Sequence, residues 1–420
     1  MMFYKETEFK HEPPLGNVPK EWEVVKLKDV ADYLNGYPFS PKDWKDKGLP
    51  IIRIQNLNDP DAQFNYFDGD IEDRYIVENG DLLFSWSASI GAYIWNRGKA
   101  VLNQHIFKVI PNGSVDKLYL YYVLFLAIEQ LKRRVHGSTM KHFKKTELET
   151  KIPLPPLGEQ KKIAEVLGVV DSVIGLVDRV ILKTERLKKG LMQTLLTRGI
   201  GHKEYKQTPI GTIPKEWQVV RLAEVTTKIK DMDHKMPKKQ EDGIPFISIR
   251  YMLKYPDFAF TIDYDDPDLE YISKEDYENQ VRRFNVEKND ILYSRFGSIG
   301  NAKFVVTEQP FIASYSIVLV KPDREKVSPE FLVCALNSER TRRQARLQTK
   351  GATNRNLHLE DIENLKIPIP PMHEQRKIAE TLLSVDKKLE LEKLEKVRLE
   401  RIKQSLMDLL LTGKIRVKVD

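Results

Sequence analysis

Two stretches of the sequence are rich in basic residues and contain no acid. Residues 132–145 and 340–355 each hold six lysines or arginines. Cations at this density could contact the phosphates of a nucleic acid, although basic residues also gather at solvated helix C-termini. Both runs fall at the same point of an internal repeat, which favours phosphate contact. The predicted phosphate-binding residues are Lys132, Arg133, Arg134, Lys141, Lys144, Lys145, Arg340, Arg342, Arg343, Arg346, Lys350 and Arg355.

A second set of residues could read bases. If two similar halves bind different sequences, the reading side chains must lie where the halves differ. Arginine, asparagine, glutamine and serine present suitable donors and acceptors to base edges. Each such residue could equally be an ordinary surface residue. The predicted base-reading residues are Arg53, Gln55, Asn56, Ser87, Arg250, Arg295 and Asn354.

No enzyme signature accompanies these residues. The sequence contains neither a Gly-x-Gly-x-x-Gly nor a Gly-x4-Gly-Lys-Ser/Thr motif, and no Asp/Asn-Pro-Pro-aromatic motif of amino-methyltransferases. Its eight histidines are scattered, and Cys334 lies in an apolar run typical of a core. We therefore predict no catalytic residue, no metal site and no cofactor in this chain.

Composition limits the remaining possibilities. A chain of 420 residues is too long for one ordinary core, so two or more domains are expected. The net charge of +7 weakly favours a polyanionic partner. A single cysteine excludes a disulfide framework, and the polar N-terminus does not resemble a signal peptide. The apolar run 118–128 is too short to span a membrane. A cytoplasmic location fits.

The elements that would position these residues are written twice. Residues 16–30 return as 211–225, each with a Pro-Lys-Glu-Trp sequence. The segment Pro-x-Pro-Pro-x-x-Glu-Gln-x-x-Ile-Ala occurs at 153–164 and again at 368–379. Proline prevents a helix from starting earlier, so Glu159 and Glu374 should fall near a helix N-terminus. The predicted order is a domain at 1–156, a helix at 157–200, a domain at 201–371 and a helix at 372–420.

Each domain should be a mixed α/β domain. Short strands are expected at 22–27, 49–54, 82–86 and 92–95, and their counterparts at 217–222, 244–249, 291–295 and 302–306. A helix is expected near 116–134 in the first half and near 329–347 in the second. The second half carries about twenty extra residues, inserted in two or more places before its long helix.

The two long helices carry apolar residues mostly at steps of three and four, with a polar step before Leu187 and a less regular spacing after Leu389, and this is the coiled-coil pattern. The expected seam contains Ile163, Leu167, Val170, Ile174, Val177, Ile181, Leu187, Leu191 and Leu195 in the first helix, and Ile378, Leu382, Val385, Leu389, Leu394, Val397, Ile402, Leu406 and Leu410 in the second. Each stripe is most simply buried against its twin, and the connection then makes the pair antiparallel. The alternative is two independent, hinged domains on separate helices.

The doubled Pro-rich motif, the Pro-Lys-Glu-Trp segments and the Gly-Ser-Thr and Gly-Ala-Thr loops resemble those of the specificity subunits of type I restriction–modification systems. The resemblance covers essentially the whole chain. It implies a non-catalytic subunit with two target-recognition domains, each reading one part of a bipartite, asymmetric site in double-stranded DNA. The paired helices would then set the spacer between the two parts.

The resemblance also implies partner subunits. Two modification subunits would supply adenine-N6 methylation with S-adenosylmethionine, and restriction subunits would supply ATP- and Mg²⁺-dependent translocation and cleavage. The polar helix faces around Lys161, Lys162, Glu165, Arg376 and Lys377 could dock such partners, or could simply be solvated. Two rival functions remain open, namely a protein-interaction scaffold without specific DNA binding and an enzyme with an unfamiliar site.

Overall fold

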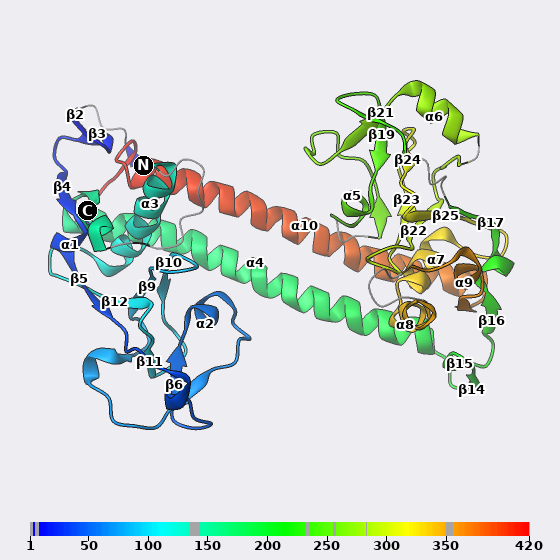
Figure 1. Cartoon of the computed structure of the whole chain (residues 1–420), viewed down its shortest axis with the longest axis horizontal. Coiled ribbons are helices and arrows are strands. Elements are labelled where there is room, and N and C mark those ends of the chain that lie inside the picture. Colours follow the sequence, from blue (N-terminus) through cyan, green and yellow to red (C-terminus); the bar gives the residue numbers. More distant parts are fainter. Residues whose placement is uncertain are drawn as a thin grey trace. The chain divides into compact units, whose positions relative to one another are not determined.

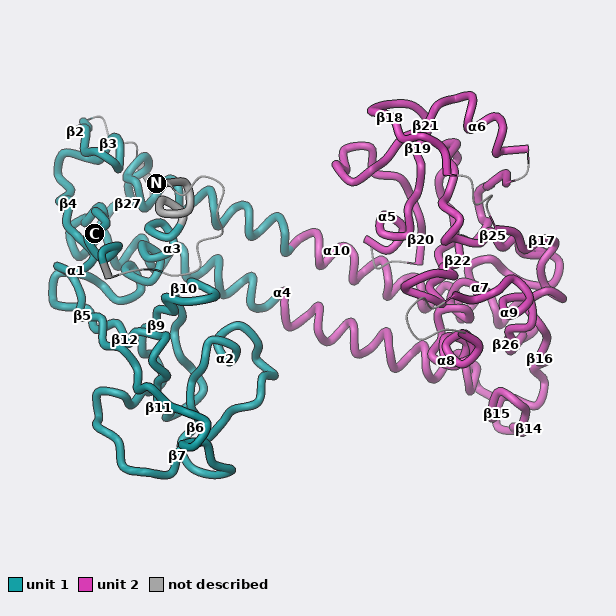
Figure 2. The backbone as a smooth tube through the Cα atoms, viewed as in Figure 1, with its two compact units in different colours: residues 1–176, 396–420 teal, residues 177–395 magenta. Residues whose placement is uncertain are grey.

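The computed structural model describes residues 3–4, 8–134, 143, 145–231, 236–254, 258–282, 284–349 and 356–419. Of residues 3–4, 129–134 and 145 it describes the backbone alone. The chain divides into two compact units (Figure 2). Unit 1 comprises residues 1–176 and 396–420, and unit 2 comprises residues 177–395. Each unit therefore combines one mixed α/β domain with a segment of each long helix.

The described residues of unit 1 form two four-stranded sheets and three short strand pairs. The sheet β10-β9-β12-β5 is antiparallel, and in the sheet β7-β6-β11-β8 only β6 and β11 run parallel. The further pairs are β2–β3, β4–β13 and β1–β27. The strands are β1 (Phe3–Tyr4), β2 (Phe9–Glu12), β3 (Gly16–Pro19), β4 (Glu23–Lys26), β5 (Ala31–Asn35), β6 (Leu49–Ile52), β7 (Asn65–Phe67), β8 (Ile76–Val77), β9 (Leu82–Ser85), β10 (Gly91–Ile94), β11 (Ala100–Leu102), β12 (Ile106–Pro111), β13 (Lys151–Leu154) and β27 (Arg416–Val417).

Unit 2 repeats this plan with additions. Its first sheet, β17-β25-β22-β23-β20, and its second, β18-β21-β19-β24, each contain one parallel pair, β20–β23 and β19–β24. The pairs β14–β15 and β16–β26 correspond to β2–β3 and β4–β13. The strands are β14 (Tyr205–Thr208), β15 (Gly211–Pro214), β16 (Gln218–Arg221), β17 (Thr226–Asp231), β18 (Lys239–Gln240), β19 (Ile244–Ile247), β20 (Ala259–Phe260), β21 (Glu270–Ile272), β22 (Ile291–Ser294), β23 (Ala302–Val305), β24 (Ile312–Ala313), β25 (Ile317–Pro322) and β26 (Lys366–Ile369).

Helices cover the sheets in both units (Figure 1). In unit 1, α3 packs on the β10-β9-β12-β5 sheet through buried side chains such as Tyr119 and Val123. The helices and 3-10 turns are α1 (Leu27–Val30), η1 (Pro41–Asp43), α2 (Ile54–Asn58), η2 (Asp73–Tyr75), α3 (Lys117–Arg134), η3 (Lys145–Glu149), α4 (Leu157–Arg198), η4 (Leu222–Val225), α5 (Ile249–Lys254), α6 (Lys274–Val281), α7 (Pro329–Leu336), α8 (Glu339–Gln348), α9 (Leu359–Glu363) and α10 (Met372–Leu410).

The helix predicted near 329–347 is two helices, which corrects the expectation of one. The first, α7, ends at Leu336, and the second, α8, begins at Glu339. Asn337 donates its side-chain amide to Ala302 O at 2.7 Å and to Val333 O at 2.9 Å. Ser338 then caps α8 by accepting from Thr341 N. Asparagine and serine favour caps because their side chains compete for backbone hydrogen bonds, so this pair interrupts the helix.

The long helices start where the prolines predict. Helix α4 begins directly after Pro156 and α10 directly after Pro371. Glu159 and Glu374 lie in the first turns and are buried, each accepting the indole N–H of a tryptophan. Trp22 Nε1 donates to Glu159 at 3.1 Å, and Trp217 Nε1 donates to Glu374 at 3.0 Å. The Pro-Lys-Glu-Trp and Pro-Pro-x-x-Glu-Gln motifs are therefore two sides of one contact.

Each carboxylate also holds the chain that follows a long helix. In unit 1, Arg416 donates to Glu159 through Nε at 2.6 Å and through a terminal nitrogen at 2.8 Å. In unit 2, His202 Nε2 lies 2.9 Å from Glu374 Oε1, which also accepts from Ile200 N. The segments after α10 and after α4 thus occupy matching places.

The neighbouring glutamines have a matching role of their own. Gln160 Oε1 accepts from Asp116 N at 2.8 Å, just before α3, and Gln375 Oε1 accepts from Ser328 N at 2.9 Å, just before α7. Both amide groups also donate to the carbonyl of the preceding proline run. The Glu-Gln pair therefore ties the start of each long helix to a tryptophan, to a returning segment and to the next helix of the domain.

Within each unit the segments of α4 and α10 run antiparallel and are joined by ion pairs. In unit 1, Lys403 Nζ lies 2.6 Å from Asp171. In unit 2, Lys393 Nζ lies 2.8 Å from Glu185, and Lys188 pairs with Asp386. These contacts confirm the predicted antiparallel pairing of the helices.

The predicted seam is wrong in part. Leu187, Leu394, Val397 and Ile402 are exposed, between 42% and 53% of their surface. Beyond Leu389 the face of α10 turned toward α4 includes Lys393 and Lys403, which form the ion pairs with α4. These leucine, valine and isoleucine side chains continue the apolar spacing in the sequence, but in the structure they point outward. None of the helices in the described part of the chain is both long enough and apolar enough to cross a membrane.

Candidate functional site

Three chain segments meet in the same way in both units, and together they form what we call the loop frame. In unit 1 the frame consists of residues 53–55, 86–87 and 103–105, and in unit 2 of residues 248–250, 295–296 and 314–316. Asn103 N donates to Ile52 O at 3.2 Å, and Ser314 N donates to Ile247 O at 2.9 Å. The loop after β11 or β24 is thereby held beside the end of β6 or β19.

The other side of the frame is also repeated. Trp86 N donates to His105 O at 3.3 Å, and Arg295 N donates to Ser316 O at 3.0 Å. The end of each basic run is attached here, because Phe143 N donates to Trp86 O at 2.7 Å and Leu357 N, just after the second run, donates to Arg295 O at 3.1 Å. Backbone bonds therefore fix one scaffold twice, while the side chains carried on it differ.

In unit 1 the frame borders a groove of about 290 Å³. Its lining includes Trp44, Arg53, Gln55, Gln104 and His105. Arg53 donates to Asn65 Oδ1 at 3.1 Å, and its guanidinium lies 5.0 Å from the centre of the Trp44 ring. Gln55 and His105 are exposed. The groove thus offers amide, imidazole and guanidinium groups beside an aromatic ring, a set suited to hydrogen bonds with base edges.

Asn56 does not belong to this groove, which corrects its prediction as a base-reading residue. Its side chain is fully buried, accepts from Arg53 N at 3.1 Å and donates to Ala62 O and Gln63 O, both at 3.2 Å. An amide committed in this way cannot reach a base without leaving buried groups unpaired. Asn56 instead shapes the turn that carries Arg53 and Gln55. Ser87 is 7% exposed and lies on the frame.

In unit 2 the corresponding groove has a volume of about 590 Å³ and is bordered by Arg250 and Phe296. The Arg250 side chain is 84% exposed. Arg295 is only 5% exposed and pairs with Asp231, with its guanidinium 5.4 Å from the centre of the Phe296 ring. Of these two predicted base readers, Arg250 is the accessible one.

The arginines of α8 differ from one another in their contacts. Arg342 donates to Gly300 O, Asn301 Oδ1 and Asn337 Oδ1, at 3.2, 2.9 and 2.7 Å. Arg340 donates to Thr212 O at 3.1 Å, and burial lowers the pKa of both guanidinium groups. Arg346 pairs with Glu339, whereas Arg343 is exposed. Arg342 therefore supports the turn between β22 and β23, and Arg343 remains accessible for a phosphate.

For the other predicted phosphate-binding and base-reading residues, the structure describes the backbone alone or does not describe the residue. Lys132, Arg133 and Arg134 belong to the end of α3, and Lys145 opens η3. Their side chains are not described. Lys141, Lys144, Lys350, Asn354 and Arg355 lie outside the described residues. Among the described residues, no group of three or more histidine, cysteine, aspartate or glutamate side chains is arranged to hold a metal ion.

Arg342 and Arg343 make a matched pair for mutation. We expect Arg342→Ala to lower the free energy of unfolding by about 2 kcal/mol, because the charged hydrogen bonds to Gly300 O, Asn301 Oδ1 and Asn337 Oδ1 are lost together. Arg343→Ala should change stability by less than about 0.5 kcal/mol. If Arg343 contacts a phosphate, its loss should reduce the salt slope of DNA binding by about one. Urea unfolding measures the change in stability, and DNA-binding titrations at several salt concentrations measure the salt slope. Equal destabilisation by the two variants would contradict the structural role given to Arg342.

Two segments of the frame, 103–105 with Gln104 and His105 and 314–316 with Tyr315, were not predicted from the sequence. Gln104 and His105 follow β11, and Tyr315 occupies the matching loop after β24. The signal was present, because Asn103–His105 and Ser314–Ser316 both lead into an isoleucine that starts a strand. The equivalence of the two loops is hard to see in the sequence, because the short segments on either side of them differ between the halves.

Comparisons with known proteins bear on the whole chain. The family model described as "Type I restriction modification DNA specificity domain" matches residues 19–185 and 214–401. The chain is 32% identical over 428 residues to the type I restriction enzyme MjaVIII specificity subunit of Methanocaldococcus jannaschii, covering 100% of this chain and 98% of that protein. It is 24% identical to the EcoBI specificity subunit of Escherichia coli, covering 86% of this chain and 78% of that protein.

A solved structure shares the fold. The crystal structure of a type I restriction–modification S subunit from M. genitalium aligns with a TM-score of 0.59 and 17% identity, covering 93% of this chain and 96% of that one. Two family matches, one in each half, agree with the duplicated loop frame. The chain belongs to the family of type I restriction–modification DNA specificity subunits.

Proposed function

We propose that this chain is the DNA-recognising, non-catalytic subunit of a type I restriction–modification complex. Unit 1 reads one part of a bipartite, asymmetric site in double-stranded DNA, and unit 2 reads the other. The observation that carries this proposal is the loop frame, in which the same backbone hydrogen bonds hold different side chains in the two units. A shared scaffold with different exposed groups is what two domains of common descent need to read two different sequences.

Partner subunits would supply the chemistry. Two modification subunits would use S-adenosylmethionine, and restriction subunits would use ATP and Mg²⁺. The sequence has no glycine-rich phosphate loop, and the described residues include no acidic or histidine cluster able to hold a metal. We assign these cofactors to the partner subunits, as the resemblance to the family implies. We also propose a cytoplasmic location, where the chain would meet the DNA that it recognises.

Apolar side chains on the outer faces of the helices support assembly with partners. In unit 1, Val169, Val173 and Leu176 follow one another at steps of four and three along α4, and they are 59%, 38% and 53% exposed. In unit 2, Leu187 and Leu391 are 53% and 55% exposed. Exposed apolar groups aligned on one helix face are typical of a surface that binds another protein.

Binding of the full chain to DNA, alone and with its copurified modification subunits, tests the proposal. Affinity for a mixed-sequence duplex should fall steeply with salt, because several phosphate contacts release counterions. Sequencing of methylated adenines in the host genome should then reveal one two-part motif. A chain that bound no DNA at any salt concentration would be a protein scaffold, and a methyltransferase or nuclease activity of the purified chain alone would make it an enzyme.

A further inference from the structure

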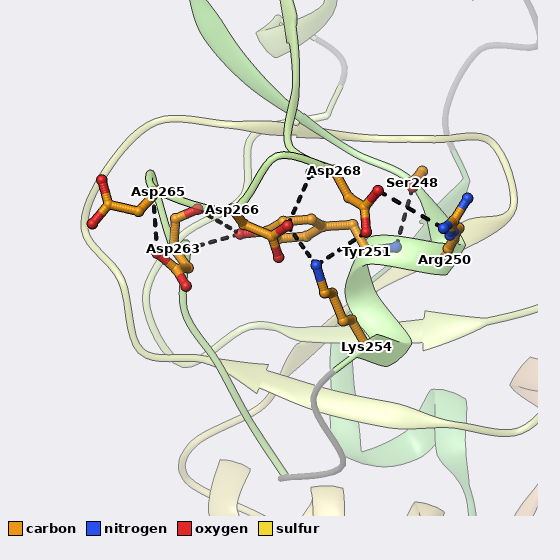
Figure 3. Close-up of polar contacts among 8 residues, drawn as sticks. All are labelled: Ser248, Arg250, Tyr251, Lys254, Asp263, Asp265, Asp266 and Asp268. Carbon is orange, nitrogen blue, oxygen red and sulfur yellow. Dashed lines mark hydrogen bonds and ion pairs between the residues drawn. The ribbon is translucent and has the colours of Figure 1, made fainter. Parts of the chain in front are cut away.

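The groove of unit 2 contains a basic and an acidic side chain on opposing segments. Arg250 comes from α5, and Asp268 comes from the connection that leads to β21. One terminal nitrogen of Arg250 lies 3.8 Å from Asp268 Oδ1 (Figure 3). This distance is too long for a hydrogen bond. The two groups therefore form a long, exposed ion pair that contains no hydrogen bond.

The connection that supplies Asp268 is longer than its counterpart in unit 1. Residues 248–269 join β19 to β21, whereas residues 53–64 join β6 to β7. The strands on either side keep the same pairing in both units. The connection contains an acidic stretch with Asp263, Asp265, Asp266 and Asp268. Asp266-Pro-Asp268 has a counterpart in unit 1, Asp59-Pro-Asp61, and in both the N–H of the second aspartate donates to the carboxylate of the first at 2.9 Å. Asp268 borders the groove of unit 2, whereas Asp61 is not among the residues that line the groove of unit 1.

Hydrogen bonds hold residues 263–268 of this connection against α5. Tyr251 is 1% exposed, and its hydroxyl accepts from Asp263 N at 2.9 Å and donates to Asp263 O at 3.1 Å (Figure 3). Lys254 Nζ donates to Asp266 Oδ1 at 2.5 Å and to Asp268 Oδ2 at 3.0 Å. The hydrogen bond to Asp266 raises the pKa of Lys254. Lys254 thereby fixes the Asp268 carboxylate by one oxygen.

The remaining groups are available to a ligand. With Oδ2 bound to Lys254, Asp268 Oδ1 keeps its lone pairs, and no hydrogen bond to it is found within the described chain. Arg250 likewise makes no hydrogen bond to the described residues through its guanidinium, and its side chain is 84% exposed. The groove thus presents a fork of donors next to a single fixed acceptor.

A G·C base pair has the complementary arrangement. In the major groove guanine offers two acceptors, O6 and N7, and cytosine beside it offers the N4 donor. We propose that Arg250 and Asp268 together read one G·C base pair in the part of the site recognised by unit 2, with Arg250 on guanine and Asp268 on cytosine N4. At the position equivalent to Arg250, unit 1 has Gln55, whose amide suits adenine instead. This assignment rests on the proposed function.

The test uses the full chain with its copurified modification subunits. The site is first mapped from methylated adenines, and binding is then measured on duplexes that carry each single base-pair change in both parts of the site. The variants are Arg250→Ala and Asp268→Asn. Lys274→Ala on α6, where the lysine side chain is 83% exposed, is the matched control within unit 2. Gln55→Ala is the counterpart in unit 1.

Arg250→Ala should weaken binding to the natural site about 10- to 100-fold and abolish discrimination at one G·C pair only. Asp268→Asn should reduce discrimination at that same pair, with an unchanged melting temperature. Gln55→Ala should affect the other part of the site, and Lys274→Ala neither. A uniform loss on all duplexes with a lower salt slope would show that Arg250 contacts phosphate and would overturn the proposal, as would unchanged binding. If the unmodified complex prefers no sequence, the proposed function itself fails.

Discussion

Replacing Glu159 with alanine is expected to lower the free energy of unfolding of unit 1 by about 3 kcal/mol, because the buried charge of Arg416 loses its buried partner and keeps a pair with Glu21, whose side chain is 71% exposed. Glu159 is 3% exposed and accepts hydrogen bonds from Trp22 and from two nitrogens of Arg416. Its removal leaves an indole N–H unpaired as well. Hydrogen exchange across β4 and β13, measured with urea unfolding, should show the loss confined to unit 1.

The matched control is Glu165→Ala, six positions along the same helix. Glu165 is exposed, and within the described part of the chain its carboxylate pairs with Lys162. Its removal should change stability by less than about 0.5 kcal/mol. Glu374→Ala should reproduce the large effect in unit 2, where Trp217 and His202 lose their partner. Similar small effects for Glu159→Ala and Glu165→Ala would show that the buried carboxylate is not needed.

Exchange of a whole domain should have the largest effect on function. A chain whose residues 20–150 come from a family member with a different site is expected to keep one part of its DNA site and replace the other. Several mismatched base pairs at about 1–3 kcal/mol each should reduce affinity for the original site by roughly 10³-fold or more. Exchange of residues 215–365 should replace only the second part. Methylated-adenine sequencing measures both, and a change in both parts after either exchange would contradict independent reading.

Much of the fold was predictable because the sequence contains an internal repeat, so each element could be inferred from two copies. The Pro-rich segments predicted the starts of α4 and α10, since proline excludes any earlier helical residue. The strands β6, β9 and β10 and their counterparts followed from apolar runs bounded by turn residues. The break between α7 and α8 was not predicted, because it depends on the bond from Asn337 to the distant Ala302.

The candidate site was less predictable because accessibility depends on contacts far along the chain. Arg342 and Arg343 are neighbours of identical type, yet only the first meets Asn301 and Asn337. The amide of Asn56 has the chemistry to bind a base. The fold shows that this amide is already hydrogen-bonded to Ala62 O and Gln63 O. The assignments of Lys141, Lys350 and Asn354 stay predictions.

The contact of Arg416 with Glu159 also has a consequence for the order of events during synthesis. Unit 1 needs residues 396–420, and these include β27, the partner of β1. Unit 2 is complete once residue 395 has been made. The domain that leaves the ribosome first is therefore the one that completes its contacts last, because its Glu159 carboxylate cannot meet Arg416 until the segment after α10 has been made.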